Sequence, residues 1–459
     1  MNRPFPFIIL AACSSMLGSS NALADEKPLS FYNHVFPILK RSCNGCHYPG
    51  KLKGQLDLTT YEAFQKGGKH GATFKPGDPK AGTLMEEISG AEPSMPKEGD
   101  PLTKDEVALI ERWIREGAKD DTPADANSFK LAAPPVYSTP PVVTALAYSP
   151  DGKVLAISGY HEVLLHSADG SKLMARLVGE SPRIESLAYS ADGRMLAVAG
   201  GAPARFGEVQ IWDTSTNGLA KTYKVSTDSI YGISFSPEAD RIAFGCADKS
   251  VRIIAVKDGK ELLKFDNHSD WVFGTTFTLN GKRLLTGSRD RAMKLIDASN
   301  SQFIDDINKL LEPILCIARH PKEDIIAYGG EMGTARTYRI AENQGRTAAN
   351  NDVNILKEFE RLPGPVHAIA YSPDGSLIAV GGHNGELRLY NAQDGTRRAT
   401  LKGHHGAVFA VAFHPSTNQI ATAGFDGNVR IYETAKGAMV KDFIPVTLTP
   451  REPLQSAAR

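Results

Sequence analysis

The sequence predicts two fold classes in one chain, an N-terminal all-α domain followed by an all-β domain of seven four-stranded units. Apolar residues recur at helical spacing near the N-terminus, whereas turn segments recur about every 42 residues in the rest of the chain. The 459 residues are 41% hydrophobic and 23% charged, which is enough for more than one domain with its own core.

The N-terminus carries an export signal. Arg3 precedes an apolar run from Phe5 to Leu17, and an Ala-Leu-Ala sequence ends at Ala24. This pattern predicts a signal peptide over residues 1–24. Cys13 follows Leu-Ala-Ala, so acylation of Cys13 and a lipid anchor are the alternative. Because no later segment approaches 18 uninterrupted apolar residues, we expect no transmembrane span in the mature chain and a location in the periplasm or cell envelope.

The charges of the chain are balanced. Lys plus Arg and Asp plus Glu each number 52. A strong global field that would attract nucleic acid or an anionic membrane is therefore absent. We expect protein partners rather than nucleic acid.

Two helices are predicted in the first domain, residues 25–119. Apolar residues at helical spacing mark Phe31–Arg41, with Pro37 as a point of weakness or a kink. Thr103 followed by Glu106 forms a capping-box sequence before an apolar face, and predicts a second helix that ends near Gly117.

Between these helices, Cys43-Asn44-Gly45-Cys46-His47 has the spacing of a c-type haem attachment site. Each thiol can add to a haem vinyl group, and His47 then binds the iron as an axial ligand. A zinc half-site would need a second ligand pair, which the sequence lacks. A thioredoxin-like redox pair would need a surrounding βαβ pattern and would leave His47 unexplained.

The second iron ligand must come from elsewhere in the domain. Met95, 48 residues after His47 and followed by Pro96, is the first candidate, because a thioether stabilises ferrous iron. Met85 lies on an expected helix face, and His70 lies in a glycine-rich stretch. These two residues, or an open iron site, remain alternatives.

The segment from Phe31 to Ala118 resembles the small c-type cytochrome domains abundant in planctomycetes and related bacteria. The resemblance rests on Val35-Phe36-Pro37-Ile38-Leu39, the haem motif, Gly54–Leu58, Gly67-Gly68, Met95-Pro96 and Trp113-Ile114-Arg115-Glu116-Gly117-Ala118. It implies one covalent haem c held by Cys43 and Cys46, with His47 and Met95 as axial ligands.

A linker rich in Pro and Ala, residues 120–141, precedes the repetitive part of the chain, residues 142–447, and a tail follows at 448–459. Seven turn segments come after short β-rich runs, and most of their spacings are 41 to 46 residues. They begin at Ser149, Ser190, Ser236, Thr278, His320, Ser372 and His414. This period predicts seven units of four strands.

The repeats resemble the WD-repeat family, which implies a seven-bladed β-propeller. The last repeat has the expected order, with strands at 408–413, 419–423, 428–432 and 439–443. The signature residues are sparse, since Trp212-Asp213 is the only literal Trp-Asp pair. The resemblance implies that the side chains of one set in the last repeat form a structural hydrogen-bond network: His404, Thr422, Asp426 and Tyr432.

Three further features are expected to be structural. The insertions at 200–207 and 341–352 are expected to form loops. Cys246 and Cys316 lie two repeats apart, which favours separate buried thiols over a disulfide. The two histidines of His161–His166 are too far apart for a zincin motif and lie in an expected strand, so no metal is assigned there.

The main functional hypothesis is an exported single-haem cytochrome that transfers electrons and docks redox partner proteins of the cell envelope on its propeller. No hydrolase motif is present, so we expect an electron carrier rather than a stand-alone enzyme. One alternative is a two-centre oxidoreductase with a second cofactor on the propeller, although its nearest histidines, His320 and His367, are expected at the rim. The other is a haem-based redox-sensing protein.

Overall fold

The computed structural model describes residues 28–44, 46–48, 51–97, 99–123, 133–309, 311–340 and 354–450. The chain divides into two compact units, residues 1–127 and 128–459. The predicted signal peptide with Cys13, and the predicted insertion at 341–352, lie outside the described residues. Across the described ranges, no helix combines the length and the apolar character needed to cross a membrane.

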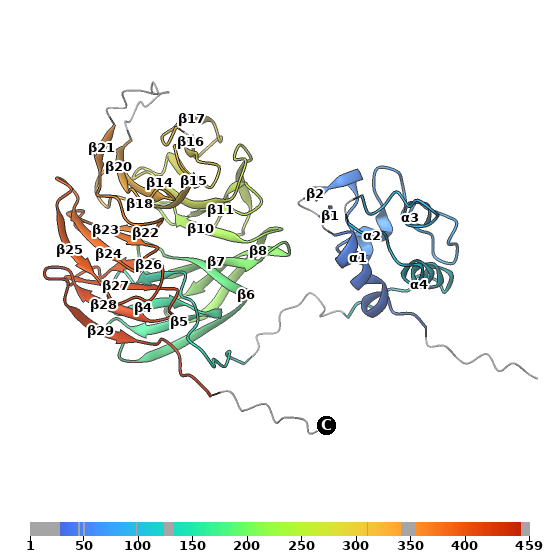
Figure 1. Ribbon diagram of the computed structural model, residues 1–459, viewed down its shortest axis with the longest axis horizontal. Helices are drawn as coiled ribbons and strands as arrows, with labels where there is room; N and C mark the ends of the chain where they lie inside the picture. The colour runs from blue at the N-terminus through green and yellow to red at the C-terminus, as the bar shows by residue number, and fades with distance from the viewer. Residues whose placement is uncertain are drawn as a thin grey trace, which may run out of the picture. The chain divides into compact units, whose positions relative to one another are not determined.

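The first unit is mainly helical (Figure 1). Its elements are η1 (Phe31–Val35), α1 (Phe36–Ser42), β1 (His47–Tyr48), β2 (Lys51–Leu52), η2 (Lys53–Gln55), α2 (Tyr61–Lys66), α3 (Leu84–Ile88) and α4 (Lys104–Arg115). The predicted first helix is divided into the π-helical turn η1 and the α-helix α1. Pro37 lies in the first turn of α1, where its missing N–H leaves no intrahelical hydrogen bond unmade.

The predicted capping box of the last helix is confirmed. The Thr103 hydroxyl oxygen accepts a hydrogen bond from the Glu106 backbone N–H at 3.3 Å, and the Glu106 carboxylate accepts one from the Thr103 N–H at 2.9 Å. The helix ends at Arg115, and Gly117 follows with a φ of 100°, a conformation that glycine adopts without strain. Local sequence therefore fixes both ends of α4.

Trp113 of α4 lies at the centre of the helical unit and is 1% exposed. Its ring is stacked on Phe64, with the ring planes 9° apart, and its centroid is 5.4 Å from that of Phe31 and 5.1 Å from that of Phe74. The indole N–H donates to the carbonyl oxygen of Lys119 at 3.2 Å. One side chain thus joins three separate parts of this unit.

We expect Trp113→Ala to destabilise the helical unit by about 3–5 kcal/mol, because it removes the largest buried side chain and leaves a cavity. Trp113→Phe keeps most of the aromatic contact and should cost less. Denaturant unfolding monitored by far-ultraviolet circular dichroism gives both values. Equal stability of the alanine variant and the wild type would contradict this description of the core.

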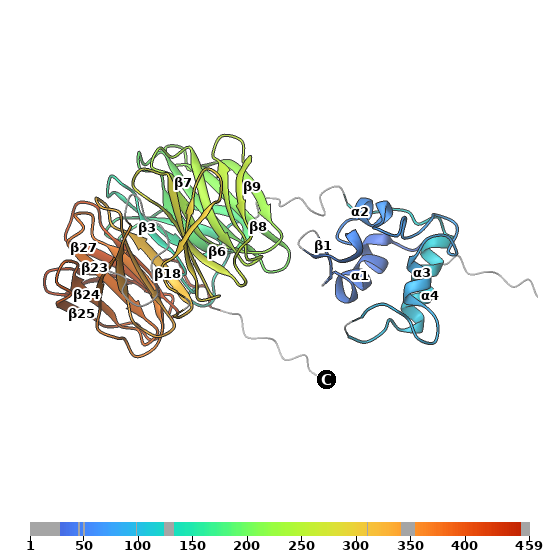
Figure 2. The same ribbon diagram turned by 90° about the horizontal axis from the view of Figure 1, so that it is seen from above.

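The second unit is all-β, and its described residues form six antiparallel sheets (Figures 1 and 2). The first sheet has seven strands, β3 (Leu146–Tyr148), β4 (Val154–Ser158), β5 (Tyr160–Ser167), β6 (Leu173–Tyr189), β7 (Met195–Ala202), β8 (Phe206–Asp213) and β9 (Gly218–Ser226). The second and third are β10 (Ile230–Phe235), β11 (Arg241–Cys246), β12 (Val251–Ala255), β13 (Glu261–Phe265), and β14 (Val272–Phe277), β15 (Arg283–Ser288), β16 (Met293–Asp297), β17 (Phe303–Asp306).

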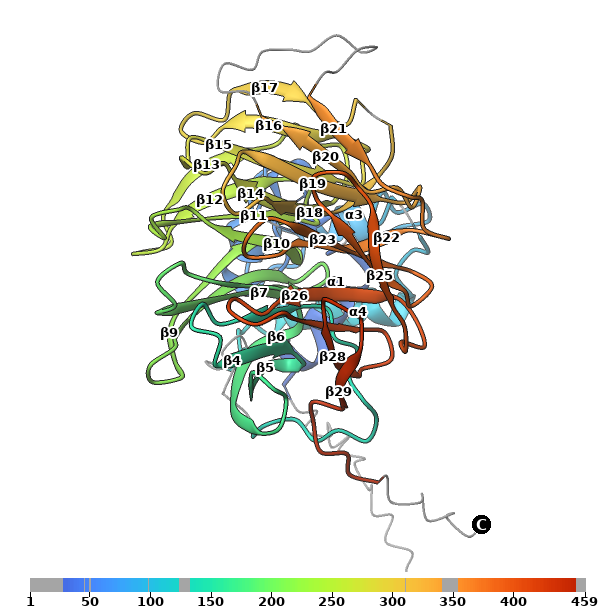
Figure 3. The same ribbon diagram turned by 90° about the vertical axis from the view of Figure 1, so that its left-hand side faces the viewer.

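The remaining three sheets also have four strands each (Figure 3). They are β18 (Ile314–Arg319), β19 (Ile325–Gly330), β20 (Arg336–Arg339), β21 (Ile355–Glu358); β22 (Val366–Tyr371), β23 (Leu377–Gly382), β24 (Leu387–Asn391), β25 (Arg397–Leu401); and β26 (Val408–Phe413), β27 (Gln419–Gly424), β28 (Val429–Glu433), β29 (Met439–Phe443). The four strands predicted for the last repeat are confirmed to within one residue at each end.

The number of sheets differs from the predicted seven because of β6, which is 17 residues long. Its first part pairs with β5 through Val178, and its second part pairs with β7 from Arg183 onward. Arg183 also faces Tyr160 of β5, so the strand continues between its two sets of partners. Two predicted four-stranded units are thereby joined in one sheet.

Five of the seven predicted turns share one side-chain hydrogen-bond pattern. The Ser149 hydroxyl accepts the N–H of Val154 at 3.0 Å, and Ser190, Ser236, Thr278 and Ser372 accept the N–H five residues later in the same way. At the other two turns, Nδ1 of His320 and of His414 accepts backbone N–H groups instead. His320 is therefore a structural turn residue, as predicted.

Neighbouring sheets contact one another through the strands that precede these turns, and β26 of the last sheet also contacts β3 of the first. The Val143 N–H donates to the Gly424 carbonyl oxygen at 3.1 Å, and one hydrophobic cluster contains residues of both sheets. Tyr137, which precedes the first strand of this unit, forms a parallel bridge with Leu448, which follows the last strand. The two ends of the all-β unit are therefore in contact.

The prediction that the insertion at 200–207 forms a loop is wrong. Residues 200–202 and 206–207 instead extend β7 and β8 into a longer hairpin, in which Ala202 faces Phe206. The small residues allow this, because a Cβ atom on Gly200 would lie 2.0 Å from the Arg183 carbonyl oxygen of the neighbouring strand. The insertion is therefore paired strand rather than an irregular excursion.

Candidate functional site

The cysteine motif follows directly from α1. The Cys43 N–H caps the helix by donating to the Leu39 carbonyl oxygen at 2.8 Å. The Cys43 carbonyl oxygen then accepts the N–H groups of Cys46 at 3.1 Å and His47 at 3.2 Å. The motif thus forms a tight turn that keeps the two thiols and the imidazole on one short segment.

The imidazole of His47 has a defined tautomer. Its Nδ1 lies 2.9 Å from the backbone carbonyl oxygen of Lys53, and a carbonyl oxygen only accepts hydrogen bonds. In the neutral imidazole the proton is therefore on Nδ1, which leaves Nε2 with a free lone pair. This is the arrangement in which a histidine binds a metal through one ring nitrogen and is oriented through the other.

The two thiols are free. Burial raises the pKa of Cys43 to about 11, and this effect outweighs that of nearby Arg41. A redox-active pair or a zinc ligand requires a readily formed thiolate, which a lowered pKa provides. The free Cys43 thiol is therefore less acidic than an ordinary cysteine.

Met95 contacts the same hydrophobic cluster as Cys43. Its N–H donates to the Glu87 carbonyl oxygen at 2.9 Å, which fixes the backbone of the loop next to α3. The peptide bond between Met95 and Pro96 is cis. The loop carrying the thioether is thus tied to the helical core.

The rival ligands differ in their settings. Met85 belongs to α3, as its neighbours predicted, and packs on the same cluster as Met95. His70 is exposed, in a tight turn closed by hydrogen bonds between Gly68 and Gly71. Cys43, Cys46, His47 and a methionine packed on the core offer two thiols, one imidazole nitrogen and a thioether, a donor set that fits haem c.

The predicted network in the last repeat is present in part. His404 contacts Thr422 Oγ1 through Nε2 at 2.7 Å and Asp426 Oδ1 through Nδ1 at 3.0 Å. The Tyr432 hydroxyl donates instead to the Lys402 carbonyl oxygen at 2.8 Å. Arg430 completes the set by donating to Asp426 Oδ2 at 2.8 Å.

A second network of the same kind, which was not predicted from the sequence, lies in an earlier repeat. His268 contacts Thr286 and Asp290, each at 2.8 Å, and the spacing of these three residues is the same as that of His404, Thr422 and Asp426. The signal was hidden because an asparagine precedes His268 where a glycine precedes His404. Comparing spacings between repeats would have found it.

Asp426 gives the last repeat a predicted acid sensitivity. Burial alone would raise its pKa, but hydrogen bonds from Arg430 and His404 outweigh burial and lower the pKa to about 2. The pKa of Asp in an unfolded chain is about 4. The ionised carboxylate of Asp426 therefore stabilises the folded state above pH ~4, and this stabilisation is lost as the pH falls toward 2. We expect the stability difference between wild type and Asp426→Asn to shrink from pH 6 to pH 2, measured by urea unfolding. A difference independent of pH would contradict this assignment.

A cavity of about 220 Å³ runs along strands of all six sheets. It is lined by residues of β3, β6, β10, β14, β18, β22 and β26. His367 of β22 is among them. His367 lies at a register shift between Val366 and Ala368, and the equivalent shift occurs in β10, β14, β18 and β26.

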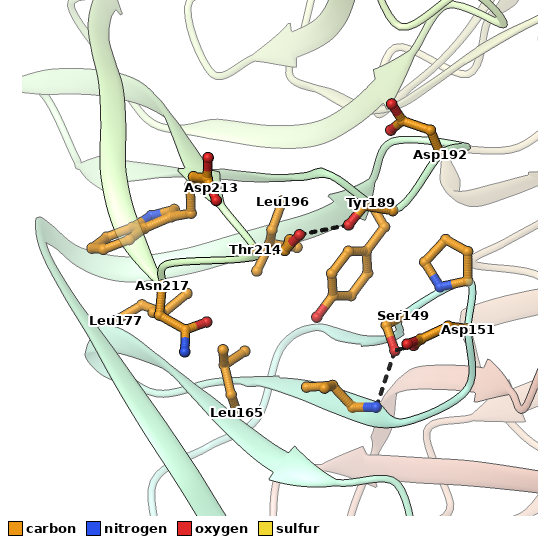
Figure 4. Close-up of a pocket in the computed structure, with 14 residues that line it drawn as sticks. Ser149, Asp151, Leu165, Leu177, Tyr189, Asp192, Leu196, Asp213, Thr214 and Asn217 are labelled. Atoms are coloured by element: carbon orange, nitrogen blue, oxygen red, sulfur yellow. Dashed lines mark hydrogen bonds between the residues drawn. The ribbon is translucent and has the colours of Figure 1, made fainter.

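A second cavity, of about 210 Å³, is lined by parts of β4 to β8 and their turns. Figure 4 shows Tyr189 and Leu165 facing it from different strands. Its acidic rim residues are held in their own turns, as Asp151 accepts from the Ser149 hydroxyl and Asp213 from that of Ser215. These carboxylates already have partners.

The remaining predicted features are structural. Cys246 is buried in β11 and Cys316 half-buried in β18, and both are free thiols. His166 in β5 is buried, and its Nε2 lies 2.9 Å from the Pro445 carbonyl oxygen. Within the described residues, no group of three or more His, Cys, Asp or Glu side chains is placed to hold a metal ion.

Comparisons with known families match both units. The family described as "Planctomycete cytochrome C" matches residues 43–99, which include the cysteine motif and Met95. The family "WD domain, G-beta repeat" matches residues 218–254, 259–297 and 395–433, and the "Anaphase-promoting complex subunit 4 WD40 domain" matches residues 319–408.

Individual relatives match over only part of the chain. Eukaryotic translation initiation factor 3 subunit I of Bombyx mori is 25% identical over 30% of this chain and 42% of its own length. The U3 small nucleolar RNA-associated protein 15 homolog of Xenopus tropicalis is 25% identical over 40% of this chain and 34% of its own length. Apoptotic protease-activating factor 1 of Rattus norvegicus is 24% identical over 35% of this chain and 15% of its own length.

The chain thus spans less than half the length of these three relatives, and the similarity shows the type of repeat rather than a shared activity. The family matches agree with the two resemblances found in the sequence, and they imply haem c in the first unit. The chain joins a cytochrome c domain of the planctomycete type to a region of WD repeats.

Proposed function

We propose that this protein is an exported, single-haem c-type cytochrome that transfers electrons, with its WD repeats as the docking platform for redox partner proteins of the cell envelope. The observation that carries the proposal is the cysteine motif with a His47 imidazole whose Nδ1 donates to the Lys53 carbonyl oxygen. That hydrogen bond leaves Nε2 for the iron. In the same unit, Met95 packs against the hydrophobic core and supplies a thioether.

The bound haem supplies one-electron chemistry. Cys43 and Cys46 fix it covalently to the end of α1, and the Lys53 carbonyl oxygen orients His47. Met95 favours the reduced state through its neutral, polarizable sulfur. The aromatic residues around Trp113 form the buried core on which Cys43 and Met95 pack.

For the WD-repeat region, the proposal is a closed propeller of seven blades. The contact of β26 with β3 supports closure, and so does a channel lined by seven strands in succession. The division of β6 between two sets of partners supports two blades in the first sheet. A closed ring presents rigid loops at its faces, which suits protein recognition.

Export and cleavage after Ala24 remain part of the proposal, because the maturation of haem c takes place outside the cytoplasm. We do not extend the proposal to a second haem on the WD repeats. The channel cavity of about 220 Å³ is smaller than the roughly 300–1,000 Å³ of usual cofactor sites.

Voltammetry of the full chain adsorbed on an electrode tests electron transfer. The proposal expects one reversible one-electron wave. A haem that is bound but cannot be cycled between oxidation states would contradict electron transfer and favour a sensing role. In that case, partner binding rather than current should depend on the oxidation state.

A further inference from the structure

Two histidines face each other at the channel of the WD-repeat region. His367 lies in β22, and its Nε2 is 3.3 Å from Nδ1 of His383, which directly follows β23. Their ring centroids are 5.5 Å apart. His383 is exposed and His367 half-buried, so the pair reaches from the channel wall to solvent.

This pairing differs from the other histidine contacts. Other imidazoles of the described chain contact an oxygen atom, as those of His47, His166, His268, His404 and His414 do. Those of His34 and His320 accept backbone N–H groups. Neither His367 nor His383 has such a partner among the described residues. One nitrogen of each ring, Nε2 of His367 and Nδ1 of His383, faces the other ring.

The distance between the two nitrogens fits a shared metal ion. A hydrogen bond between the two nitrogens would be long at 3.3 Å, since the usual donor–acceptor distance of an N–H···O bond is about 2.9–3.0 Å. Two imidazole nitrogens, each about 2.0–2.1 Å from a tetrahedral ion, lie about 3.3–3.4 Å apart. The observed separation thus matches joint ligation without movement of the backbone.

The backbone holds both residues in place. The His383 N–H donates to the Pro365 carbonyl oxygen at 3.0 Å, which joins the turn after β23 to the segment before β22. The His367 ring packs edge-on against Phe409 of the next sheet, with 5.3 Å between the centroids. A binding site whose ligands are already positioned loses less entropy on binding.

We propose that His367 Nε2 and His383 Nδ1 bind one divalent transition-metal ion of the kind that prefers imidazole, such as Zn²⁺. Two protein ligands leave the other coordination positions to water, for which the exposed side of His383 and the channel cavity provide room. The site is separate from the proposed haem ligands and does not depend on the haem assignment.

The test is isothermal titration of the full-length haem-loaded protein with Zn²⁺ in a buffer that does not bind metal. We expect one saturable site, weakened about tenfold or more in His367→Gln and in His383→Gln, since each variant loses one of the two protein ligands. His405→Gln removes an exposed imidazole from a neighbouring loop and should leave the affinity unchanged.

A variant-free measurement accompanies the titration. Zn²⁺ should protect His367 and His383 from modification by diethyl pyrocarbonate, read by peptide mass spectrometry, while His405 stays reactive. If no saturable binding is seen at Zn²⁺ concentrations up to about 1 mM, the proposal is overturned. Equal affinity in wild type and both glutamine variants, or unprotected histidines, would overturn it as well.

Discussion

Full-length protein with both Cys43 and Cys46 replaced by alanine is expected to contain no covalent haem after export in a host that matures c-type cytochromes. Both thioether bonds are then absent, and the remaining ligands hold haem only by coordination and packing. A single replacement should leave one thioether and a lower yield of haem protein. Intact mass after denaturation measures the covalent fraction directly.

The matched control is Cys316→Ala, which removes a free, half-buried thiol of the WD-repeat region. Its haem content should equal that of the wild type. Covalent haem in the double variant would contradict the assignment of the attachment site. Loss of haem in the Cys316 variant would indicate that misfolding, rather than loss of attachment, lowers the yield.

Met95→His is expected to lower the reduction potential of the haem by on the order of 100 mV, because a second imidazole stabilises ferrous iron less than a thioether does. Met95→Ala should open the iron to water or added ligands. Redox titration followed by absorption gives the potential, and binding of added imidazole measures the open position.

Met85→Leu is the control for this experiment. Met85 packs on the same cluster as Met95, and leucine preserves most of its volume. The potential of this variant should stay close to that of the wild type. A large shift in Met85→Leu together with an unchanged potential in Met95→His would transfer the ligand role to Met85.

Elements determined by local sequence were predictable. The capping box of Thr103 and Glu106 fixed the start of α4, and Gly117 its end, because both signals act through the backbone of one turn. The strands of the last repeat followed from alternation and turn residues. The haem motif was recognisable because its chemistry requires a fixed spacing over five residues.

Features that depend on partners far away in the sequence were not predictable. The continuity of β6 arises from pairing with β5 on one side and β7 on the other. The register shift at His367 arises from the pairing of β22 with β23, as the equivalent shifts do in four other sheets. The pairing of 200–202 with 206–207 depends on glycines that permit close approach of Arg183, a residue of the neighbouring strand.

Absorption spectra of the oxidised and reduced full chain, recorded with its intact mass after export, test the central claim most directly. We predict the mass of the chain without residues 1–24 plus one haem, reversible reduction, and the weak sulfur-to-iron band of a methionine ligand in the oxidised spectrum. A protein without haem would contradict the account and leave a WD-repeat interaction protein. If the mass shows one haem but the oxidised spectrum lacks the sulfur-to-iron band, the protein is a cytochrome and Met95 is not its iron ligand.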